Sequence, residues 1–349
     1  MAAITYKCPN CGGGLIFDPQ TQKYACEYCR SEFAEEELGD LDEEAKEEPA
    51  AEDSGGEAET AVLYICPSCG AQIVAEETTA ATFCYYCHNP VVLSGRLSGQ
   101  WKPDRVIPFQ IGREKAEEIF RQWVGRKKFV PRAFTSQGSV DKITGVYYPY
   151  WIYSCRVKGR IQGQGTSVSS HTNGSVRVTT TRIYDVDRSG QTEIKGLVRN
   201  ALKKADHRLA DGVQPFEMEK AQDFSMGCLS GFMAEKRDME IADFSQEVGR
   251  EVEEFFLESL KNQGGSYSSF QITDKEVHRD QEEWSYALLP VWTLTYRDKG
   301  SGKMYYFALN GQTGKTCGCL PVDKGRLAVL FVSVFVPILV FMLIVGYII

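Results

Sequence analysis

The sequence predicts a multidomain fold. Two small β ribbons built around cysteine pairs precede an α+β body, and a single transmembrane helix ends the chain. Three observations lead to this prediction. Eight cysteines in the first ninety residues form C-x-x-C pairs, the middle of the chain mixes helical and strand patterns, and the last 23 residues carry no charge. A chain of 349 residues is long enough for two or three folded units.

The first ninety residues contain an internal repeat with an offset of 58 residues. The first copy holds Tyr6, Cys8, Pro9, Cys11, Gly12, Cys26, Tyr28 and Cys29. They recur in the second copy as Tyr64, Cys66, Pro67, Cys69, Gly70, Cys84, Tyr86 and Cys87. The repeat predicts that one small unit is used twice, over residues 1–34 and 62–99.

The spacing of the cysteines in both copies is typical of a structural zinc site. A C-x-x-C knuckle lets two thiolates reach one ion, and a second knuckle completes a tetrahedron with Zn–S bonds of about 2.3 Å. The predicted ligands are Cys8, Cys11, Cys26 and Cys29 in the first ribbon and Cys66, Cys69, Cys84 and Cys87 in the second. Each pair of knuckles is separated by fourteen residues. Four thiolates leave no open position on the ion, so both predicted Zn²⁺ sites are structural.

Two other interpretations of these cysteines stay open, namely thioredoxin-like redox pairs and iron in place of zinc. The first residues lack the basic and apolar segments of a signal peptide, which favours a reducing compartment and metal binding over disulfides. Gly12 and Gly70 follow the second cysteine of a knuckle, where a left-handed backbone is often needed.

Residues 35–61 are predicted to be an acidic, flexible linker. Between Glu35 and Thr60, thirteen acidic residues stand against one basic residue, a local charge of −12. Because the whole chain has a net charge of −8, the remainder is only about +4 (−8 minus −12). Such a chain offers no large basic surface for phosphates, which argues against nucleic acid as a partner.

Residues 100–322 are predicted to form the α+β body, a helix packed on an antiparallel sheet. Apolar residues at helical spacing predict one helix around Ala116, Ile119, Phe120, Trp123 and Val124 and a second around Val248, Val252, Phe255, Phe256 and Leu260. The predicted strands are 106–109, 146–157 with an interruption at Pro149, and a pair at 284–296 and 303–316. Residues 159–186 predict a long hairpin that turns at Asn173-Gly174.

The body carries a fainter repeat with an offset of 141 residues. Pro149, Trp151, Arg156, Lys158 and Gly159 recur as Pro290, Trp292, Arg297, Lys299 and Gly300. Each copy follows a predicted helix, so the pattern suggests that the helix-on-sheet unit is duplicated.

Residues 327–349 are predicted to span the cell membrane once. They contain no charge, and at 1.5 Å per residue they reach about 34 Å, enough to cross the hydrocarbon core. Pro337 lies near the middle, where lipid-embedded helices tolerate proline. Lys324 and Arg326 precede the span, so the positive-inside rule predicts a cytoplasmic soluble part.

The remaining candidate sites favour packing over chemistry. Cys317 and Cys319 are expected to be ordinary thiols at a strand end, and Cys155 and Cys228 to be buried. Residues 310–316 resemble a phosphate loop, but Leu309 stands where that motif needs its first glycine, so a hairpin turn is expected. None of the four histidines pairs with a nucleophile motif, and His88 is expected to be an exposed neighbour of the second site. The chain is therefore predicted not to be an enzyme and to have no small-molecule substrate.

A basic cluster follows the first predicted helix and consists of Arg121, Arg126, Lys127, Lys128 and Arg132. It could contact anionic lipid headgroups or an acidic segment of protein. The alternative is a solvated helix end with its basic residues near the negative end of the helix dipole.

Three further segments resemble a known family. They are Ser230-Gly-Phe-Met-Ala-Glu-Lys236, Leu288-Leu-Pro-Val-Trp292 and Phe307-Ala-Leu-Asn-Gly-Gln-Thr-Gly-Lys315. With the paired ribbons, they resemble the YdjG-type zinc-ribbon membrane proteins of bacteria, which are often labelled TFIIB-type zinc-ribbon or primosomal helicase-like proteins. The resemblance implies a membrane protein that acts with an SPFH-domain protein and phage-shock protein A in envelope stress.

The expected function is therefore a membrane-anchored adaptor whose ribbons bind partner proteins. Aromatic residues of the ribbons are expected to supply the contacts, among them Tyr24, Tyr28, Phe83, Tyr85 and Tyr86. The alternative from another class is a nucleic-acid-binding module related to replication or transcription.

Overall fold

The structure is a computed structural model that describes residues 5–38, 62–70, 72–84, 88–93, 96–131, 134, 140, 142–205, 207–263, 267–298 and 302–348. The chain divides into two compact units. The first unit comprises residues 1–149, 202–238 and 287–349, and the second comprises residues 150–201 and 239–286. Two long strands, β9 (Thr144–Asn173) and β13 (Ser269–Arg297), contribute residues to both units.

The first ribbon is a three-stranded antiparallel sheet of β1 (Leu15–Asp18), β2 (Lys23–Cys26) and β3 (Glu32–Phe33). A 3-10 turn, η1 (Glu35–Leu38), follows it. The rest of the expected acidic linker, residues 39–61, lies outside the described residues.

The second ribbon begins with the antiparallel pair β4 (Val62–Ile65) and β5 (Gln72–Ala75). It continues with β6 (Thr79–Phe83) and β7 (Pro90–Val92), which are also antiparallel. Its small core consists of Tyr64, Cys66, Ala75, Cys84, Val91 and Leu93. Strands β6 and β7 belong to the second ribbon and also form one edge of the large sheet of the body.

The large sheet has ten strands among the described residues, and its main path runs β11-β8-β13-β9-β12-β6-β7. The short members are β8 (Arg105–Val106), β11 (Gln222–Asp223) and β12 (Met233–Glu235). Strand β14 (Met304–Asn310) pairs with β13 and with β15 (Thr316–Cys319). The expected antiparallel sheet is wrong in one respect. Strands β12 and β9, and likewise β13 and β8, pair in parallel, so the sheet is mixed.

In the first unit, helix α1 (Arg113–Gly125) confirms the first predicted helix. Its buried face carries Ala116, Phe120 and Val124. The rings of Phe120 and Trp123 lie 4.9 and 5.2 Å from that of Phe307 on β14, so the helix covers this part of the sheet. The short helices of this unit are η4 (Gly99–Trp101), α3 (His207–Gly212), η5 (Met218–Lys220) and η6 (Met226–Leu229).

The second unit is built on a hairpin of β9 and β10 (Val176–Asn200), with the first part of β13 beside it. The predicted turn is confirmed, since Asn173 pairs with Val176 and Gly174 has a φ of 60°. The hairpin is longer than expected, with paired residues from Tyr150 to Asn200. Pro149 does not interrupt β9, which runs through it.

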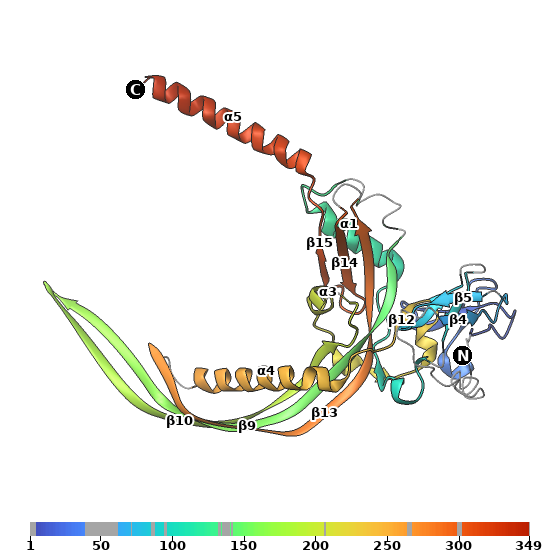
Figure 1. Cartoon of the computed structure of the whole chain (residues 1–349), viewed down its shortest axis with the longest axis horizontal. Helices are drawn as coiled ribbons and strands as arrows, with labels where there is room; N and C mark the ends of the chain where they lie inside the picture. The colour runs from blue at the N-terminus through green and yellow to red at the C-terminus, as the bar shows by residue number, and fades with distance from the viewer. Residues whose placement is uncertain are drawn as a thin grey trace. The chain divides into compact units, whose positions relative to one another are not determined.

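Helix α4 (Ile241–Asn262) lies along these strands (Figure 1) and confirms the second predicted helix. Four of the five expected apolar residues are buried, but Phe255 is 59% exposed and that assignment was wrong. The C-terminal end of α4 is capped by a side chain. Nη1 of Arg188 donates hydrogen bonds to the carbonyl oxygens of Leu260 and Lys261, at 2.9 and 2.6 Å. These bonds satisfy carbonyls that a helix end leaves without partners.

The C-terminal helix α5 (Lys324–Ile348) contains Pro337 and is not broken there. Residues Lys324–Val345 have a mean hydropathy of 3.1 and none of that stretch is buried. The helix is therefore long and apolar enough to cross a membrane and is not a core helix of the described fold.

Candidate metal centres

The first four cysteines meet at one point of the first ribbon. The Sγ atoms of Cys8, Cys11, Cys26 and Cys29 all lie within 4.8 Å of one another. Those of Cys8 and Cys29 are 3.5 Å apart, and those of Cys11 and Cys26 are 3.4 Å apart. A tetrahedron with Zn–S bonds of about 2.3 Å has edges of about 3.8 Å, so the four thiols need to move little to hold such an ion.

The backbone of each knuckle is folded to direct both thiols inward. The amide of Gly12 donates to the carbonyl of Cys8 at 2.8 Å, and the amide of Arg30 donates to that of Cys26 at 2.9 Å. Both residues have a left-handed backbone, with φ of 76° and 60°. The left-handed residue turns the chain back over the knuckle, as expected for Gly12.

The second ribbon repeats this backbone geometry. The amides of Gly70 and His88 donate to the carbonyls of Cys66 and Cys84, each at 2.9 Å, and have φ of 73° and 58°. His88 is exposed, as expected, and it takes the knuckle position that Arg30 holds in the first ribbon.

Three of the four thiols predicted for the second site come together. The Sγ atoms of Cys66, Cys69 and Cys84 lie within 4.8 Å of one another, and those of Cys69 and Cys84 are 3.7 Å apart. The fourth predicted ligand, Cys87, lies outside the described residues. Both clusters thus have donors and spacing that suit a thiophilic divalent metal ion.

Two of the crowded thiols of the first site, Cys11 and Cys29, differ in pKa. The backbone of Gly13 acts to lower the pKa of Cys11, but hydrogen bonds with Cys26 and Cys29 raise this pKa to about 12. Hydrogen bonds with the side chain and the backbone of Ser31 lower the pKa of Cys29 to about 6. The pKa values of Cys11 and Cys29 are thus shifted in opposite directions, and a bound divalent cation would favour the loss of the protons of its thiol ligands.

The segment Ser230–Lys236, one of the three on which the family resemblance rests, joins both ribbons to the body. Ser230 accepts a hydrogen bond from the amide of Phe17 at 3.0 Å and donates its hydroxyl to the carbonyl of Leu15 at 2.5 Å. Farther along the segment, Ala234 pairs with Ala81 of β6 and with Tyr147 of β9. This short segment is thus a structural link that spacing alone did not reveal.

The residue after this segment, Arg237, is buried beside the 3-10 turn η4. Its Nη2 donates to the carbonyl of Gln100 at 2.7 Å, and its guanidinium lies 4.8 Å from the ring centre of Trp101. The contact is a cation–π pair that helps to hold the chain that follows the second ribbon.

The two ribbons share a depression of about 470 Å³ next to the first cluster. It is lined by Lys7, Cys11, Gly12, Gly13, Tyr28, Pro67, Ser68 and Asn89. Tyr28 is 72% exposed, and its ring lies where a side chain at Gly13 would be. A glycine is therefore needed at position 13 for this ring to lie over the knuckle.

The expectation for Tyr24 was wrong, because this side chain is only 1% exposed. Tyr24 and Cys26 are two residues apart on β2, so both point to the buried face. Phe83 is partly exposed, and Tyr85 and Tyr86 lie outside the described residues. Of the five aromatic residues expected to make contacts, Tyr28 fits best.

The other candidate residues have structural roles. Cys155 and Cys228 are buried, and Cys317 and Cys319 lie on β15, as predicted. The loop that resembles a phosphate loop is the turn between β14 and β15. There the side chain of Asn310 donates to the carbonyls of Val213 and Pro215, at 2.9 and 3.1 Å. The loop therefore holds a neighbouring segment in place through hydrogen bonds, which is a structural role for a polar side chain of the loop.

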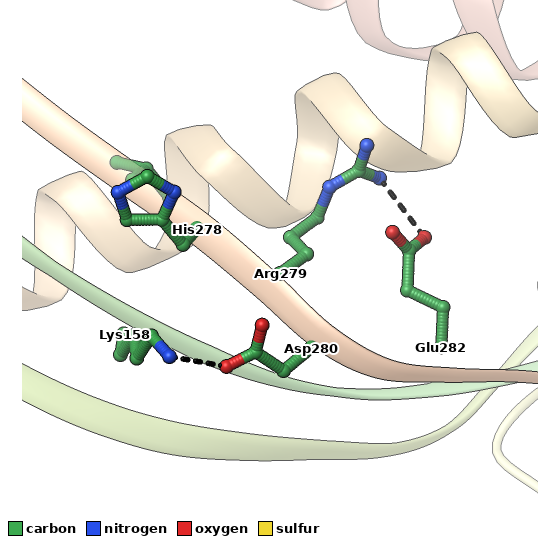
Figure 2. Close-up of a pocket in the computed structure, with 6 residues that line it drawn as sticks. Lys158, His278, Arg279, Asp280 and Glu282 are labelled. Atoms are coloured by element: carbon green, nitrogen blue, oxygen red, sulfur yellow. Dashed lines mark ion pairs between the residues drawn. The ribbon is translucent and has the colours of Figure 1, made fainter.

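A second depression, of about 460 Å³, lies on the second unit, and Figure 2 shows its lining. Ion pairs join Lys158 to Asp280 at 2.5 Å and Arg279 to Glu282 at 3.5 Å. A hydrogen bond from Lys158 lowers the pKa of the Asp280 carboxyl. The charges of this exposed surface thus largely neutralise one another.

These features define the class of protein. It has two cysteine clusters compatible with metal binding, a body on a large mixed sheet, and one C-terminal helix that could span a membrane. The chain belongs to the family of YdjG, an uncharacterized protein of Bacillus subtilis (strain 168). The two are 30% identical over 328 residues, which cover 94% of this chain and 93% of YdjG. No protein-family model matches the chain, and no solved structure matches it.

Proposed function

We propose that this protein is a non-catalytic, membrane-anchored adaptor. Each ribbon holds one structural Zn²⁺ ion, α5 crosses the cell membrane once, and the soluble part faces the cytoplasm. The ribbons bind partner proteins at the membrane surface. The partner classes are those that the family resemblance implies, an SPFH-domain protein and phage-shock protein A, in a response to envelope stress.

The observation that best supports this proposal is the depression shared by the two ribbons. It offers an exposed aromatic ring, Tyr28, on a backbone that a metal ion would make rigid. Aromatic side chains on a rigid support are frequent anchors of protein interfaces, because little side-chain entropy is lost when they are covered. Among the described residues that line the depression, Lys7 is the only lysine, arginine, aspartate or glutamate, so the surface suits a partly apolar protein segment.

Charge argues against the alternative, a nucleic-acid-binding module. Residues 1–34 carry three basic and three acidic side chains, and residues 62–99 carry Arg96 against Glu76 and Glu77. Arg96 is buried, so it offers no contact to a phosphate. Specific and non-specific DNA binding both depend on several basic side chains that displace counterions.

We also propose that the body is built from two related helix-and-sheet units. In the first unit, the indole nitrogen of Trp292 donates to the carbonyl of Ile111 at 2.9 Å, two residues before α1 begins. In the second, Trp151 donates to the carbonyl of Met239 at 3.0 Å, two residues before α4 begins. The two tryptophans are one of the matched pairs at the offset of 141 residues, and their shared role supports a duplication.

The adaptor is tested by photo-crosslinking in cells. A photoreactive phenylalanine replaces Tyr28 in the full chain, and a matched variant carries it at Lys23, which is exposed on the same ribbon outside the lining of the depression. We expect position 28 to crosslink to the SPFH-domain protein or phage-shock protein A and position 23 to give much less product. Equal products at both positions, or neither protein at position 28, would contradict the proposal.

The nucleic-acid alternative has its own measurement. The full chain in detergent is titrated with duplex and single-stranded DNA at low and at physiological salt. We expect no binding tighter than micromolar at physiological salt. Tight binding that persists there, without a crosslinked protein, would favour the alternative.

A further inference from the structure

Three exposed basic side chains directly follow α1. Arg126, Lys127 and Lys128 are exposed, and within the described part of the chain none of them forms an ion pair. By contrast, Arg121 on the helix itself pairs with Glu117 at 3.4 Å. Arg132, the last member of the predicted basic cluster, lies outside the described residues.

The chain after these residues is held against the start of α5. The amide of Asp323 donates to the carbonyl of Phe129 at 2.7 Å, and Nη1 of Arg326 lies 3.5 Å from the carbonyl of Val130. Since Lys128 precedes Phe129 and Lys324 follows Asp323, these hydrogen bonds bring two basic segments together that are almost two hundred residues apart in sequence. Both segments lie in the first unit, as do the helices α1 and α5 that are labelled in Figure 1.

We call Arg126, Lys127, Lys128, Lys324 and Arg326 the basic collar. One carboxylate in the same contact, Asp323, is already engaged. It accepts from the amide of Arg326 at 3.1 Å and pairs with the side chain of Arg326 at 3.4 Å. The five basic groups and this carboxylate leave a local charge of +4 (five minus one), on a chain whose net charge is −8.

We propose that the basic collar is a binding surface for the headgroups of anionic phospholipids. Two collar residues, Lys324 and Arg326, are among the first residues of the helix that could cross the membrane, and the other three directly precede the segment that is bonded to them, which places the collar at the depth of the headgroups if α5 spans. The surface of a membrane that contains anionic lipid attracts such residues within a Debye length. Trp123 and Phe129 are half-buried beside the collar, and aromatic side chains are enriched at this depth.

The position of the collar next to α5 favours lipid over an acidic protein segment as its ligand. One backbone hydrogen bond, from Asp323, and one side-chain hydrogen bond, from Arg326, hold the segment after α1 at the base of α5, so a bilayer that holds α5 presents headgroups to the collar at high local concentration. A protein segment would have to compete with those headgroups for the same side chains. The inference goes beyond the adaptor function, since it concerns lipid composition and requires no partner protein.

The test uses the full chain in a neutral detergent and native mass spectrometry. Phosphatidylglycerol and phosphatidylcholine are added in turn, and the lipid retained by each chain is counted. We expect wild-type chain to retain phosphatidylglycerol in preference to phosphatidylcholine. The triple variant Arg126→Gln, Lys127→Gln, Lys128→Gln is expected to bind phosphatidylglycerol at least tenfold more weakly, since each basic residue near a membrane contributes about fivefold.

A matched variant removes the same charge elsewhere. Lys23→Gln, Arg177→Gln, Arg182→Gln changes three exposed basic residues outside the collar and should leave lipid retention unchanged. An equal loss in both variants would show a general charge effect and overturn the proposal. So would equal retention of the two lipids by the wild-type chain, or displacement of the lipid by millimolar inorganic phosphate. A triple variant that keeps its lipid but loses a co-purifying acidic protein would assign the collar to that protein instead.

Discussion

The Nε atom of Arg96 donates a hydrogen bond of 2.8 Å to the hydroxyl of Tyr64, and both side chains are buried. Tyr64 belongs to the core of the second ribbon, together with the buried thiols of Cys66 and Cys84. A buried guanidinium is costly unless its donors are satisfied, so this bond is important for the stability of the ribbon.

Replacing Tyr64 by Phe should destabilise the second ribbon by about 1–3 kcal/mol, because the Nε donor of Arg96 loses its acceptor in a buried place. Hydrogen exchange of the amides in β4 and β5 measures this local stability. The control is Tyr184→Phe, which removes a hydroxyl from a side chain that is 42% exposed and should change exchange little. Unchanged protection in Tyr64→Phe would mean that another group satisfies Arg96.

The two proposed metal sites predict how many zinc ions each chain should bind. Purified under reducing conditions, the full chain should carry about two zinc ions, and Cys26→Ser should reduce this to about one, because three thiolates hold zinc less tightly than four. Plasma mass spectrometry measures the metal content. Cys319→Ser removes an exposed thiol outside both clusters and should leave the content unchanged. A content below one ion per chain, or mainly iron, would contradict the assignment.

The knuckle geometry predicts a strain effect that is separate from the ligands. A Cβ atom at Gly12 would meet nothing within 4 Å, but the residue has a φ of 76°. Gly12→Ala should therefore cost about 1–2 kcal/mol through backbone conformation alone. Release of zinc to a chelator should be roughly 5 to 30 times faster.

The matched control for this strain is Gly125→Ala at the end of α1. Gly125 also has nothing within 4 Å of its Cβ position, and its φ is not in the left-handed region. Alanine there should leave zinc release unchanged. Equal release rates for the Gly12 variant and wild type would show that the knuckle can adopt another backbone conformation.

The features that the sequence predicted well are local. Cysteine spacing identifies the knuckles, because two thiols on one tight turn can reach one ion. The helix around Phe120 was predicted because its apolar residues recur at helical spacing. The burial of Tyr24 could also have been predicted, since alternation along a strand puts it on the same face as Cys26.

What the sequence did not predict depends on contacts between distant segments. Strand β12 has three residues, too few for a recognisable pattern, and its place is set by pairing with Ala81 and Tyr147. The second arm of the long hairpin was underestimated, because β10 continues past the predicted end at residue 186 to Asn200, and its length is set by pairing with residues 150–162 of β9. Phe255 lies at the border of the apolar face of α4, where periodicity alone cannot decide burial.

Replacing either of the two matched tryptophans should destabilise the start of the helix to which it is hydrogen-bonded, and by a similar free energy. Trp292→Phe removes the hydrogen bond to Ile111, and Trp151→Phe removes the one to Met239. Each change should lower the free energy of unfolding of its unit by about 1 kcal/mol from the hydrogen bond, plus the lost packing. Hydrogen exchange in the first turns of α1 and of α4 reports the two effects separately.

The control for the tryptophans is Trp284→Phe, whose ring contacts that of Tyr153 at 4.7 Å on β9. It should leave exchange at the starts of both helices unchanged. Exchange that rises at α1 in the Trp292 variant but not at α4 in the Trp151 variant would argue against equivalent roles for the two residues.

The last prediction concerns α5. With a mean hydropathy of 3.1 and no burial in the fold, this helix should hold the chain in the membrane through extraction at high pH. Removal of residues 327–349 should release the rest as a soluble protein, since none of the apolar residues of α5 up to Val345 is buried in the described fold. Lys324 and Arg326 precede the span, so the N-terminus should be accessible only from the cytoplasm. Fractionation and labelling of an N-terminal tag on intact cells measure both properties. If the full chain is extracted at high pH, the span is wrong. If the tag is labelled from outside, the orientation is wrong, and with it the reducing environment on which the thiolate sites depend.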